Sequence, residues 1–271
     1  MDRADACGVI TLTTDFGHKD PFVGVMKGRI YDRFPAARIV DLTHEILVHW
    51  PAEAGFWIAR SFEYFPRGSV HVAVVDPGVG TARDIVLVET DGHLFLAPDN
   101  GLLAPVVARR SGALVRRLDA SRLGAFALGR VSATFHGRDL FAPLAAELAA
   151  GRCRAEDLGP LTADLVPSWV DDPVASGGAV SGVVITVDHF GNLISNIDSR
   201  WLAGFVEPHV YAGNRVLPVR RTYGDARPGD FLALVNSFDV LEIACAEGHA
   251  ADALGLSRGA PVVVRDAVRH R

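Results

Sequence analysis

Cysteine is scarce in this sequence. The 271 residues include three cysteines, Cys7, Cys153 and Cys245, which lie far apart and form no CxxC pair. An odd number of scattered cysteines predicts no disulfide framework and is typical of reduced thiols that pack as small apolar side chains. We therefore expect a cytoplasmic protein.

Long apolar runs and an excess of positive charge are also missing. No apolar segment approaches the roughly 18 residues that a membrane-spanning helix needs. Met1–Asp5 shows no basic region followed by an apolar core, so we expect neither a signal peptide nor a membrane partner. The net charge is −5, and Lys19 and Lys27 are the only lysines. Nucleic-acid-binding domains normally carry a basic balance, so we expect no nucleic-acid partner.

Several common catalytic motifs are absent. The sequence contains no GxGxxG after a strand, no P-loop, no GxSxG and no HExxH. None of the ten histidines is paired with another at helical ligand spacing beside a carboxylate. His44 and His49 are five residues apart and are assigned to a loop. We therefore expect no metal site.

What is present is an alternation of strands and helices in the first part of the chain. Apolar, β-branched runs at Val9–Thr14 and Val70–Val75 predict buried strands, and an apolar stripe repeating every four residues predicts a helix after Asp20-Pro21. Further strands are expected at Arg38–Leu42, Ile85–Glu89 and His93–Leu96, and further helices from Pro51 and over Asp139–Ala149. This pattern indicates an α/β fold with a Rossmann-like, mostly parallel sheet. Ligands bind such sheets beyond the carboxyl ends of the strands, which makes Asp15 and Asp76 candidate site residues.

A proline- and glycine-rich stretch, residues 160–178, divides the chain. It is followed by short β-rich runs at Val180–Val187, Val206–Tyr211, Arg215–Val219, Phe231–Asn236, Val240–Ala244 and Val262–Arg265. These runs predict a second, mainly antiparallel domain, either a small β-barrel or a β-sandwich. We therefore place an α/β domain at residues 1–165 and a β domain at residues 176–271.

One segment of the first domain, TTDFGHKDPFVG at Thr13–Gly24, contains two aspartates. Asp15 is placed at a strand end, where a carboxylate can accept hydrogen bonds from a ribose diol. The alternative is a turn residue that satisfies local backbone donors. Asp20 is expected to cap the helix that follows.

Two further segments combine charged and titratable residues. In VVDPGVGTARD, Val74–Asp84, a glycine-rich turn can bring Asp76 and Arg83 together, as a functional pair or as a structural ion pair. In TFHGRDLFAP, Thr134–Pro143, His136 precedes a helix whose dipole disfavours the imidazolium. A neutral ring suits a base or a hydrogen-bond acceptor, and a loop histidine with satisfied bonds is the alternative.

Five segments together resemble the SAM hydroxide adenosyltransferase family. They are the three segments above, DHFGNLISNI at Asp188–Ile197 and NSFDVLEIA at Asn236–Ala244. The family is also called the S-adenosyl-L-methionine (SAM) hydrolases and is related to the SAM-dependent fluorinase and chlorinase. The resemblance covers both domains and nearly the whole chain. It implies an N-terminal α/β domain, a C-terminal antiparallel β-barrel domain, and a homotrimer with SAM sites at subunit interfaces.

The resemblance also implies roles for individual residues. Asp76, Arg83 and His136 match the family's catalytic set, and Asp15 matches its ribose-binding aspartate. The adenine and methionine contacts fall on Asp188, Asn192, Ser237, Glu242 and the backbone near Ala244, and Trp50 matches a tryptophan that the halogenases place beside the ligand.

The implied reaction is hydrolysis of SAM to adenosine and L-methionine, by attack of an activated water on the ribose C5′. Methionine leaves as a neutral thioether, so the reaction needs no metal or other cofactor, only a positioned water that loses a proton. A carboxylate at Asp76 would repel a halide, and Asp91–Ser121 runs compactly, without the fluorinase's extra loop. Hydrolysis is therefore favoured over two alternatives, a SAM-dependent halogenase and a non-catalytic adenosine or SAM sensor that need not keep the catalytic set.

Overall fold

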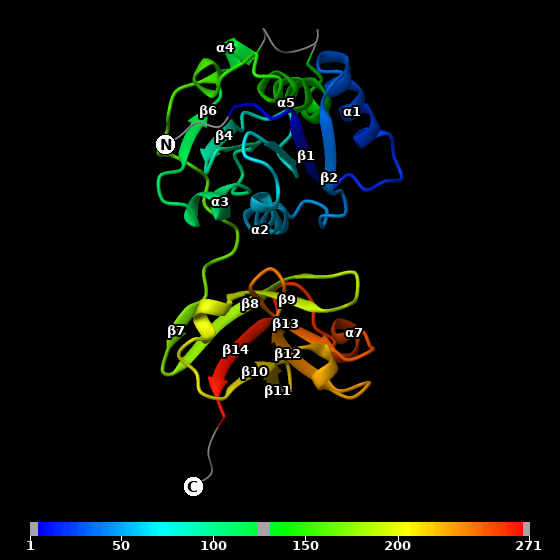
Figure 1. Ribbon diagram of the computed structural model, residues 1–271, viewed down its shortest axis with the longest axis vertical. Coiled ribbons are helices and arrows are strands. Elements are labelled where there is room, and N and C mark those ends of the chain that lie inside the picture. The colour runs from blue at the N-terminus through cyan, green and yellow to red at the C-terminus, as the bar shows by residue number, and fades with distance from the viewer. Residues whose placement is uncertain (1–4, 124–130, 268–271) are drawn as a thin grey trace. The chain divides into compact units, whose positions relative to one another are not determined.

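The computed structural model describes residues 5–123 and 131–267, whose secondary structure is drawn in Figure 1. The chain divides into two compact units, Met1–Trp169 and Val170–Arg271. Each unit has its own sheet and its own buried apolar core. The expectation of no signal peptide concerns Met1–Asp5, and residues 1–4 of this segment lie outside the described residues.

A six-stranded sheet forms the centre of the first unit. In spatial order its strands are β2 (Arg38–Thr43), β1 (Val9–Thr14), β3 (Val70–Val74), β5 (His93–Pro98), β4 (Ile85–Thr90) and β6 (Leu114–Arg117). The β2–β1, β1–β3 and β3–β5 pairings are parallel, and β4 runs against both of its neighbours. The prediction of a mostly parallel sheet is therefore confirmed.

Helices cover both faces of this sheet (Figure 1). They are α1 (Phe22–Arg33), α2 (Pro51–Ser61) with the 3₁₀ turn η1 (Phe62–Tyr64), α3 (Ala104–Ala108), α4 (Ala120–Leu123), the π-helical turn η2 (Gly137–Phe141), α5 (Ala142–Ala149) and α6 (Ala155–Leu158). Successive strand residues point to opposite faces, so Val74 of β3 packs in one core cluster with Met26 of α1, and Ala73 packs in the other with Ile58 of α2. No helix in residues 5–123 and 131–267 is long and apolar enough to cross a bilayer.

Some local details of the first unit depart from the prediction. Asp20 does not cap α1, because the helix follows Pro21 and has no side-chain cap. The helix expected from Asp139 starts earlier, with the π-helical turn at Gly137. Strand β6, with the sequence LVRR, lacks the apolar pattern that would have predicted it. The hairpin turn at Asp91-Gly92 is confirmed, and both residues have the positive φ, 50° and 82°, of a type I′ turn.

The second unit is a closed β-barrel. Around the ring its strands are β8 (Ala179–Val187), β9 (Leu193–Asp198), β13 (Val240–Cys245), β12 (Phe231–Val235), β11 (Arg215–Arg220), β10 (Pro208–Ala212) and β14 (Pro261–Asp266), which pairs back onto β8. The short strand β7 (Val174–Ser176), the 3₁₀ turns η3 (Ser199–Leu202) and η4 (Tyr223–Asp225), and the helix α7 (Ala250–Leu254) complete the unit. All of its described strand pairings are antiparallel except β11–β12. The barrel implied by the family resemblance is confirmed, and the open alternative of a sandwich is wrong.

Candidate active site

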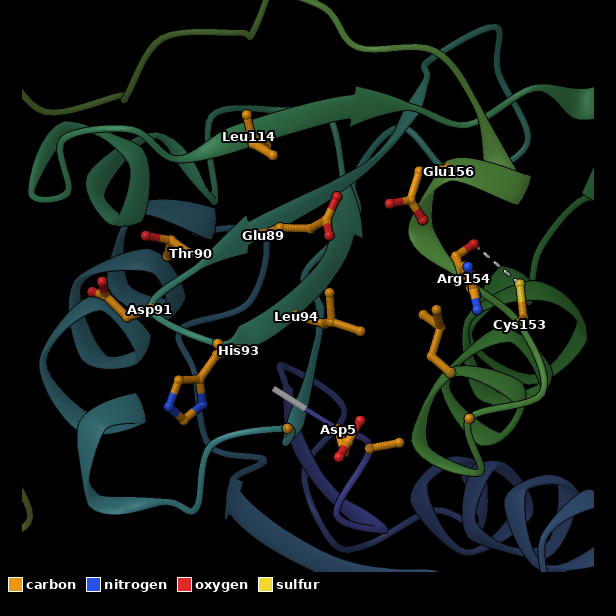
Figure 2. A pocket seen from close by; sticks show the side chains of 15 residues that line it. Asp5, Glu89, Thr90, Asp91, His93, Leu94, Leu114, Cys153, Arg154 and Glu156 are labelled. Carbon is orange, nitrogen blue, oxygen red and sulfur yellow. Dashed lines mark hydrogen bonds between the residues drawn. The ribbon is translucent and has the colours of Figure 1, made fainter. Parts of the chain in front are cut away.

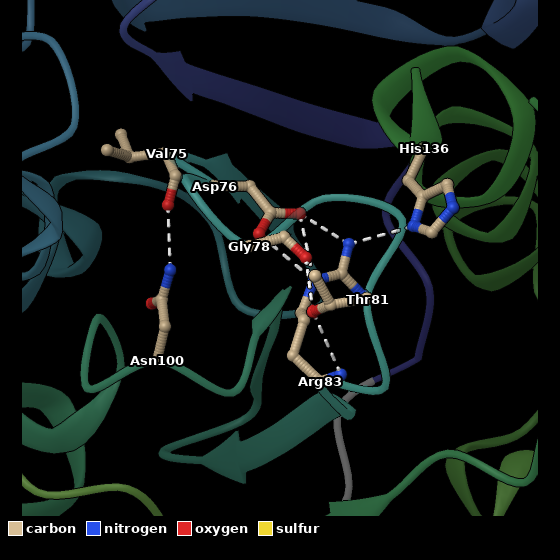
Figure 3. A network of polar contacts seen from close by, with 7 residues as sticks. All are labelled: Val75, Asp76, Gly78, Thr81, Arg83, Asn100 and His136. Atoms are coloured by element: carbon tan, nitrogen blue, oxygen red, sulfur yellow. Dashed lines mark hydrogen bonds and ion pairs between the residues drawn. The ribbon is translucent and has the colours of Figure 1, made fainter. Parts of the chain in front are cut away.

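The turn that follows β3 brings Asp76 and Arg83 side by side (Figure 3). Val79 N donates to Asp76 O at 3.2 Å, and the Thr81 hydroxyl donates to Gly78 O at 2.7 Å. Arg83 N in turn donates to Thr81 Oγ1 at 3.4 Å. These local bonds reverse the chain within a few residues, so the arginine returns to the carboxylate at the start of the turn.

A buried ion pair joins the two side chains. Arg83 Nε lies 3.0 Å from Asp76 Oδ1 and 2.9 Å from Oδ2, and Arg83 Nη2 also donates to Oδ2. The side chains of Asp76 and Arg83 are only 4% and 11% exposed. Charge-assisted bonds from one guanidinium to both carboxylate oxygens hold both groups in one orientation.

Gly80 allows this turn to lie against the segment that precedes His136. Its φ is 77°, and a Cβ at this position would lie 2.1 Å from Ala133 O. Glycine alone adopts such a φ readily and has no Cβ to collide with the neighbouring backbone. Ala133 and His136 belong to the same short segment before η2, so the close approach at Gly80 brings the histidine to the turn.

His136 contacts the arginine of this ion pair. Its Nδ1 lies 2.9 Å from Arg83 Nη2 (Figure 3). A guanidinium only donates, so Nδ1 is the acceptor and the neutral ring carries its proton on Nε2. Burial and the charge of Arg83 lower the pKa of His136, against the opposing charges of Asp76 and Asp139. The neutral ring expected from the sequence is thus favoured, with burial and the charge of Arg83 as causes.

Asp15 lies at the same edge of the sheet. Strands β1 and β3 are parallel neighbours, and Thr14 pairs with Val74 at their carboxyl ends. Asp15 directly follows Thr14, and Asp76 lies two residues after Val74, so both extend beyond the strand ends. Asp15 Oδ2 accepts a hydrogen bond from His49 N at 3.0 Å.

Trp50 lies at the start of α2 and its ring is partly buried. The ring packs edge-to-face against Trp169, with centroids 5.6 Å apart. It therefore has a packing role within the first unit whether or not it contacts a ligand.

The first unit also has a cavity of about 590 Å³, but at the opposite edge of the sheet (Figure 2). Gly68 precedes β3 and His93 begins β5, so this cavity lies at the amino ends of the parallel strands. Its Glu89 is paired with Arg116 at 2.9 Å. Because ligands of parallel sheets bind beyond the carboxyl ends, the size of this cavity does not make it the active site.

In the second unit, Asp188 organises the loop between β8 and β9. Its Oδ1 accepts from Phe190 N at 2.9 Å and Asn192 N at 2.8 Å, and its Oδ2 accepts from Asn192 Nδ2 at 3.0 Å. Asn192 is 6% exposed. The aspartate therefore fixes the loop and orients the asparagine, whose amide oxygen is left to accept a bond from a ligand.

Glu242 is a buried carboxylate of β13 with two side-chain partners. Its Oε1 accepts from the Tyr223 hydroxyl at 2.6 Å, and its Oε2 accepts from Asn236 Nδ2 at 3.1 Å. Burial raises the pKa of Glu242 despite these bonds, and burial and Glu242 together raise the pKa of Tyr223. Tyr223 and Asn236 are residues that our sequence analysis missed, although a glutamate within the apolar run VLEIAC signals a need for buried partners.

A cavity of about 470 Å³ lies beside these groups. It is lined by Phe190, Asn192, Tyr223 and Cys245–Gly248. Asn192 is thus the one predicted contact among its lining residues, whereas Asp188 and Glu242 support it through Asn192 and Tyr223.

The last two predicted contacts of the second unit lie outside this lining. Ser237 is exposed in the turn between β12 and β13. The side chain of Ala244 is buried against Leu232 and Leu234, so a ligand could meet only its backbone.

The sequence is similar to those of known proteins along most of its length. Models of the SAM hydroxide adenosyltransferase N-terminal and C-terminal domains match residues 10–159 and 182–263. A protein of Thermus thermophilus named (R)-S-adenosyl-L-methionine hydrolase is 40% identical over 259 residues, covering 93% of this chain and 98% of the relative. A protein of Salinispora tropica with the same name is 38% identical, covering 92% and 95%. A fluorinase of an Actinoplanes species is 28% identical over 221 residues, covering 70% of this chain and 71% of the relative.

Solved structures are similar along the same length. The crystal structure of an uncharacterized conserved protein from Thermotoga maritima is similar with a TM-score of 0.85 and 34% identity, covering 94% of this chain and 99% of that one. Both domain models match in order and together span most of the sequence. The chain therefore belongs to the SAM hydroxide adenosyltransferase family.

Proposed function

We propose that this protein is an enzyme that hydrolyses S-adenosyl-L-methionine to adenosine and L-methionine. The observation that carries the proposal is the buried contact of Asp76, Arg83 and His136 at the carboxyl edge of the sheet. The proposal is supported by relatives named (R)-S-adenosyl-L-methionine hydrolase at 35–40% identity, whereas the fluorinase is 28% identical.

The proposed chemistry is a displacement at the ribose C5′. The water oxygen bonds to C5′ while the C5′–S bond breaks and its electron pair passes to sulfur, releasing neutral methionine. The water proton must go to an acceptor. The Nδ1 lone pair of His136 is engaged by Arg83, whereas the carboxylate of Asp76 has lone pairs beyond those that Arg83 uses. We therefore assign proton acceptance to Asp76 and the positioning of Arg83 and the water to His136.

This reaction balances without a metal or redox cofactor, so we propose that none is used. A halogenase would have to bring a dehydrated halide close to Asp76, and the carboxylate charge opposes this. Incubation with SAM, in the presence and absence of chloride or fluoride, tests the proposal. We expect adenosine and methionine in equal amounts, independent of halide. A 5′-halo-5′-deoxyadenosine would instead support the halogenase, and bound but unchanged SAM would support a sensor.

Substrate binding is proposed to use both units. Asp15 would bind the ribose diol, and the adenine and methionine would be contacted by Trp50, Asp188, Asn192, Ser237, Glu242 and the Ala244 backbone. The apolar lining of the 470 Å³ cavity and the amide of Asn192 support a nucleoside or methionine subsite there. We further propose a cytoplasmic homotrimer in which each site takes its N-terminal and C-terminal residues from neighbouring subunits.

Truncation of the water-activating set should lower turnover strongly. Asp76→Ala, Arg83→Ala and His136→Ala should each reduce kcat about 100-fold or more, the usual scale of a lost proton acceptor or its positioning group. Adenosine should still bind, because none of the three is assigned to the nucleoside. Arg116→Ala is the matched control, since it also breaks a buried arginine–carboxylate pair, with Glu89. Near wild-type kcat in any two of the three variants would refute the assignment.

The acid limb of the pH profile should follow His136. Its pKa is lowered from an ordinary value of 6.5, so the folded protein favours the neutral ring, which accepts from Arg83. That preference stabilises the fold above pH 6.5 and is lost as the pH falls through the lowered pKa. We expect the midpoint of the acid limb of kcat/KM to lie below pH 6.5. An acid limb centred above pH 6.5 would contradict this assignment.

The Asp15 carboxylate should accept hydrogen bonds from the ribose hydroxyls. Asp15→Ala should weaken adenosine binding about tenfold or more, the scale of hydrogen bonds to a charged group, and should leave 2′,3′-dideoxyadenosine binding unchanged. Calorimetric titration of both nucleosides measures this difference. Asp20→Ala, which removes an exposed carboxylate a few residues along, is the control. If Asp15→Ala still discriminates between the two nucleosides as the wild type does, the ribose assignment is wrong.

Shared sites can be tested by mixing inactive chains. Asp76→Ala impairs the N-terminal part of a site and Asn192→Ala impairs the C-terminal part. If each site combines residues of two subunits, exchange between the two variants should restore activity, because some sites then receive two intact halves. No recovery after verified exchange would place each site within one chain, and a monomer by light scattering would rule out sharing altogether.

A further inference from the structure

The turn that carries Asp15 is bonded to a segment that follows the neighbouring strand β2. Gly17 N donates to His44 O at 2.8 Å, and Ile46 N lies 3.4 Å from Thr14 O. His49 N also donates to the Asp15 carboxylate. The backbone on either side of Asp15 is therefore held by residues about thirty positions along the chain.

Thr14 fixes the conformation of Asp15 itself. The Thr14 hydroxyl oxygen accepts from Phe16 N at 3.2 Å, which closes a side-chain turn with Asp15 at its centre. The same oxygen lies 2.8 Å from His44 Nδ1. Because the oxygen already accepts from Phe16, its single proton is available to be donated to His44.

His44 connects this turn to a charged group. With Nδ1 accepting from Thr14, the neutral ring carries its proton on Nε2, which lies 3.1 Å from Asp41 Oδ1. The other oxygen of Asp41 is 2.5 Å from Lys27 Nζ. Thr14 has no exposed surface and His44 is 1% exposed, so water cannot replace either partner. Burial lowers the pKa of His44 despite the carboxylate, which keeps the ring neutral.

We propose that His44 is a positioning residue that acts through Thr14 to hold Asp15 in its ribose-binding orientation. This inference rests on the proposed role of Asp15. The Thr14 hydroxyl is bonded to His44, and the Asp41 carboxylate lies against the ring as a charge contact, so residues that follow and belong to β2 help to fix the turn around Asp15.

A matched pair exists on the same strand. Thr11 is also fully buried, and its hydroxyl lies 2.8 Å from Nδ1 of another histidine, His71. Thr11 lies inside β1, away from the strand end, so Thr11→Val removes the same kind of bond without touching the Asp15 turn. Thr14→Val should therefore weaken adenosine binding and Thr11→Val should not, even if both substitutions lower the stability of the fold.

The test measures binding of adenosine and of 2′,3′-dideoxyadenosine by calorimetry. Thr14→Val should weaken adenosine about three- to tenfold, the effect of one hydrogen bond, and should leave the dideoxy nucleoside unchanged. Thr14→Ser should restore adenosine binding, and Thr11→Val should change neither. His44→Ala should weaken adenosine similarly, and the double variant should show less than the sum of the two effects, since both act through one bond.

Combining Thr14→Val with Asp15→Ala distinguishes the positioning role of His44 and Thr14 from the ribose-binding role of Asp15. There, Thr14→Val should cause no further loss of adenosine affinity. If Asp15→Ala loses the discrimination between nucleosides but Thr14→Val and His44→Ala keep wild-type affinities, the positioning role is overturned and the ribose assignment stands. If Asp15→Ala keeps that discrimination, both are overturned. Equal weakening of the two nucleosides by Thr14→Val would mark a purely structural residue and also overturn the positioning role.

Discussion

The pairing of Asp76 with Arg83 is the constraint on which the rest of the site depends. A carboxylate and a guanidinium buried this deeply hold each other in place through several charge-assisted bonds. Removing either would leave an uncompensated buried charge. The close approach at Gly80 brings His136 to the pair, and burial together with the charge of Arg83 lowers its pKa and favours the neutral ring. One turn and the neighbouring segment before η2 thus hold the carboxylate that we propose accepts the water proton.

The parallel sheet explains why nucleoside and nucleophile sites can be adjacent. Thr14 and Val74 are paired in register at the carboxyl ends of β1 and β3. Asp15, one residue after Thr14, and Asp76, two residues after Val74, therefore extend from the same edge. The β2 end supplies the hydrogen bonds that steady the Asp15 turn, through His44. In the proposed site, the ends of three neighbouring strands thus supply the ribose-binding carboxylate, the proton-accepting carboxylate and the positioning histidine.

Features of the fold and site that depend on local sequence patterns can be predicted from the sequence. Features that depend on long-range contacts cannot. The mostly parallel sheet follows from apolar runs alternating with helices, and Asp76 and Arg83 lie only seven residues apart across glycines. Strand patterns do not distinguish a closed barrel from a sandwich, because the β14–β8 pairing that closes the barrel joins distant segments. The Tyr223–Glu242 and Thr14–His44 bonds join residues 19 and 30 apart, and no periodicity of the sequence reports them.

Our main proposal is that water attacks the ribose C5′ of SAM and displaces methionine. The most direct measurement is turnover of SAM in water enriched in ¹⁸O, followed by mass spectrometry of both products. We predict one heavy oxygen in the 5′-hydroxyl of adenosine and none in methionine, because the C5′–S bond is the one that breaks. Label in methionine, or consumption of SAM without adenosine, would contradict it.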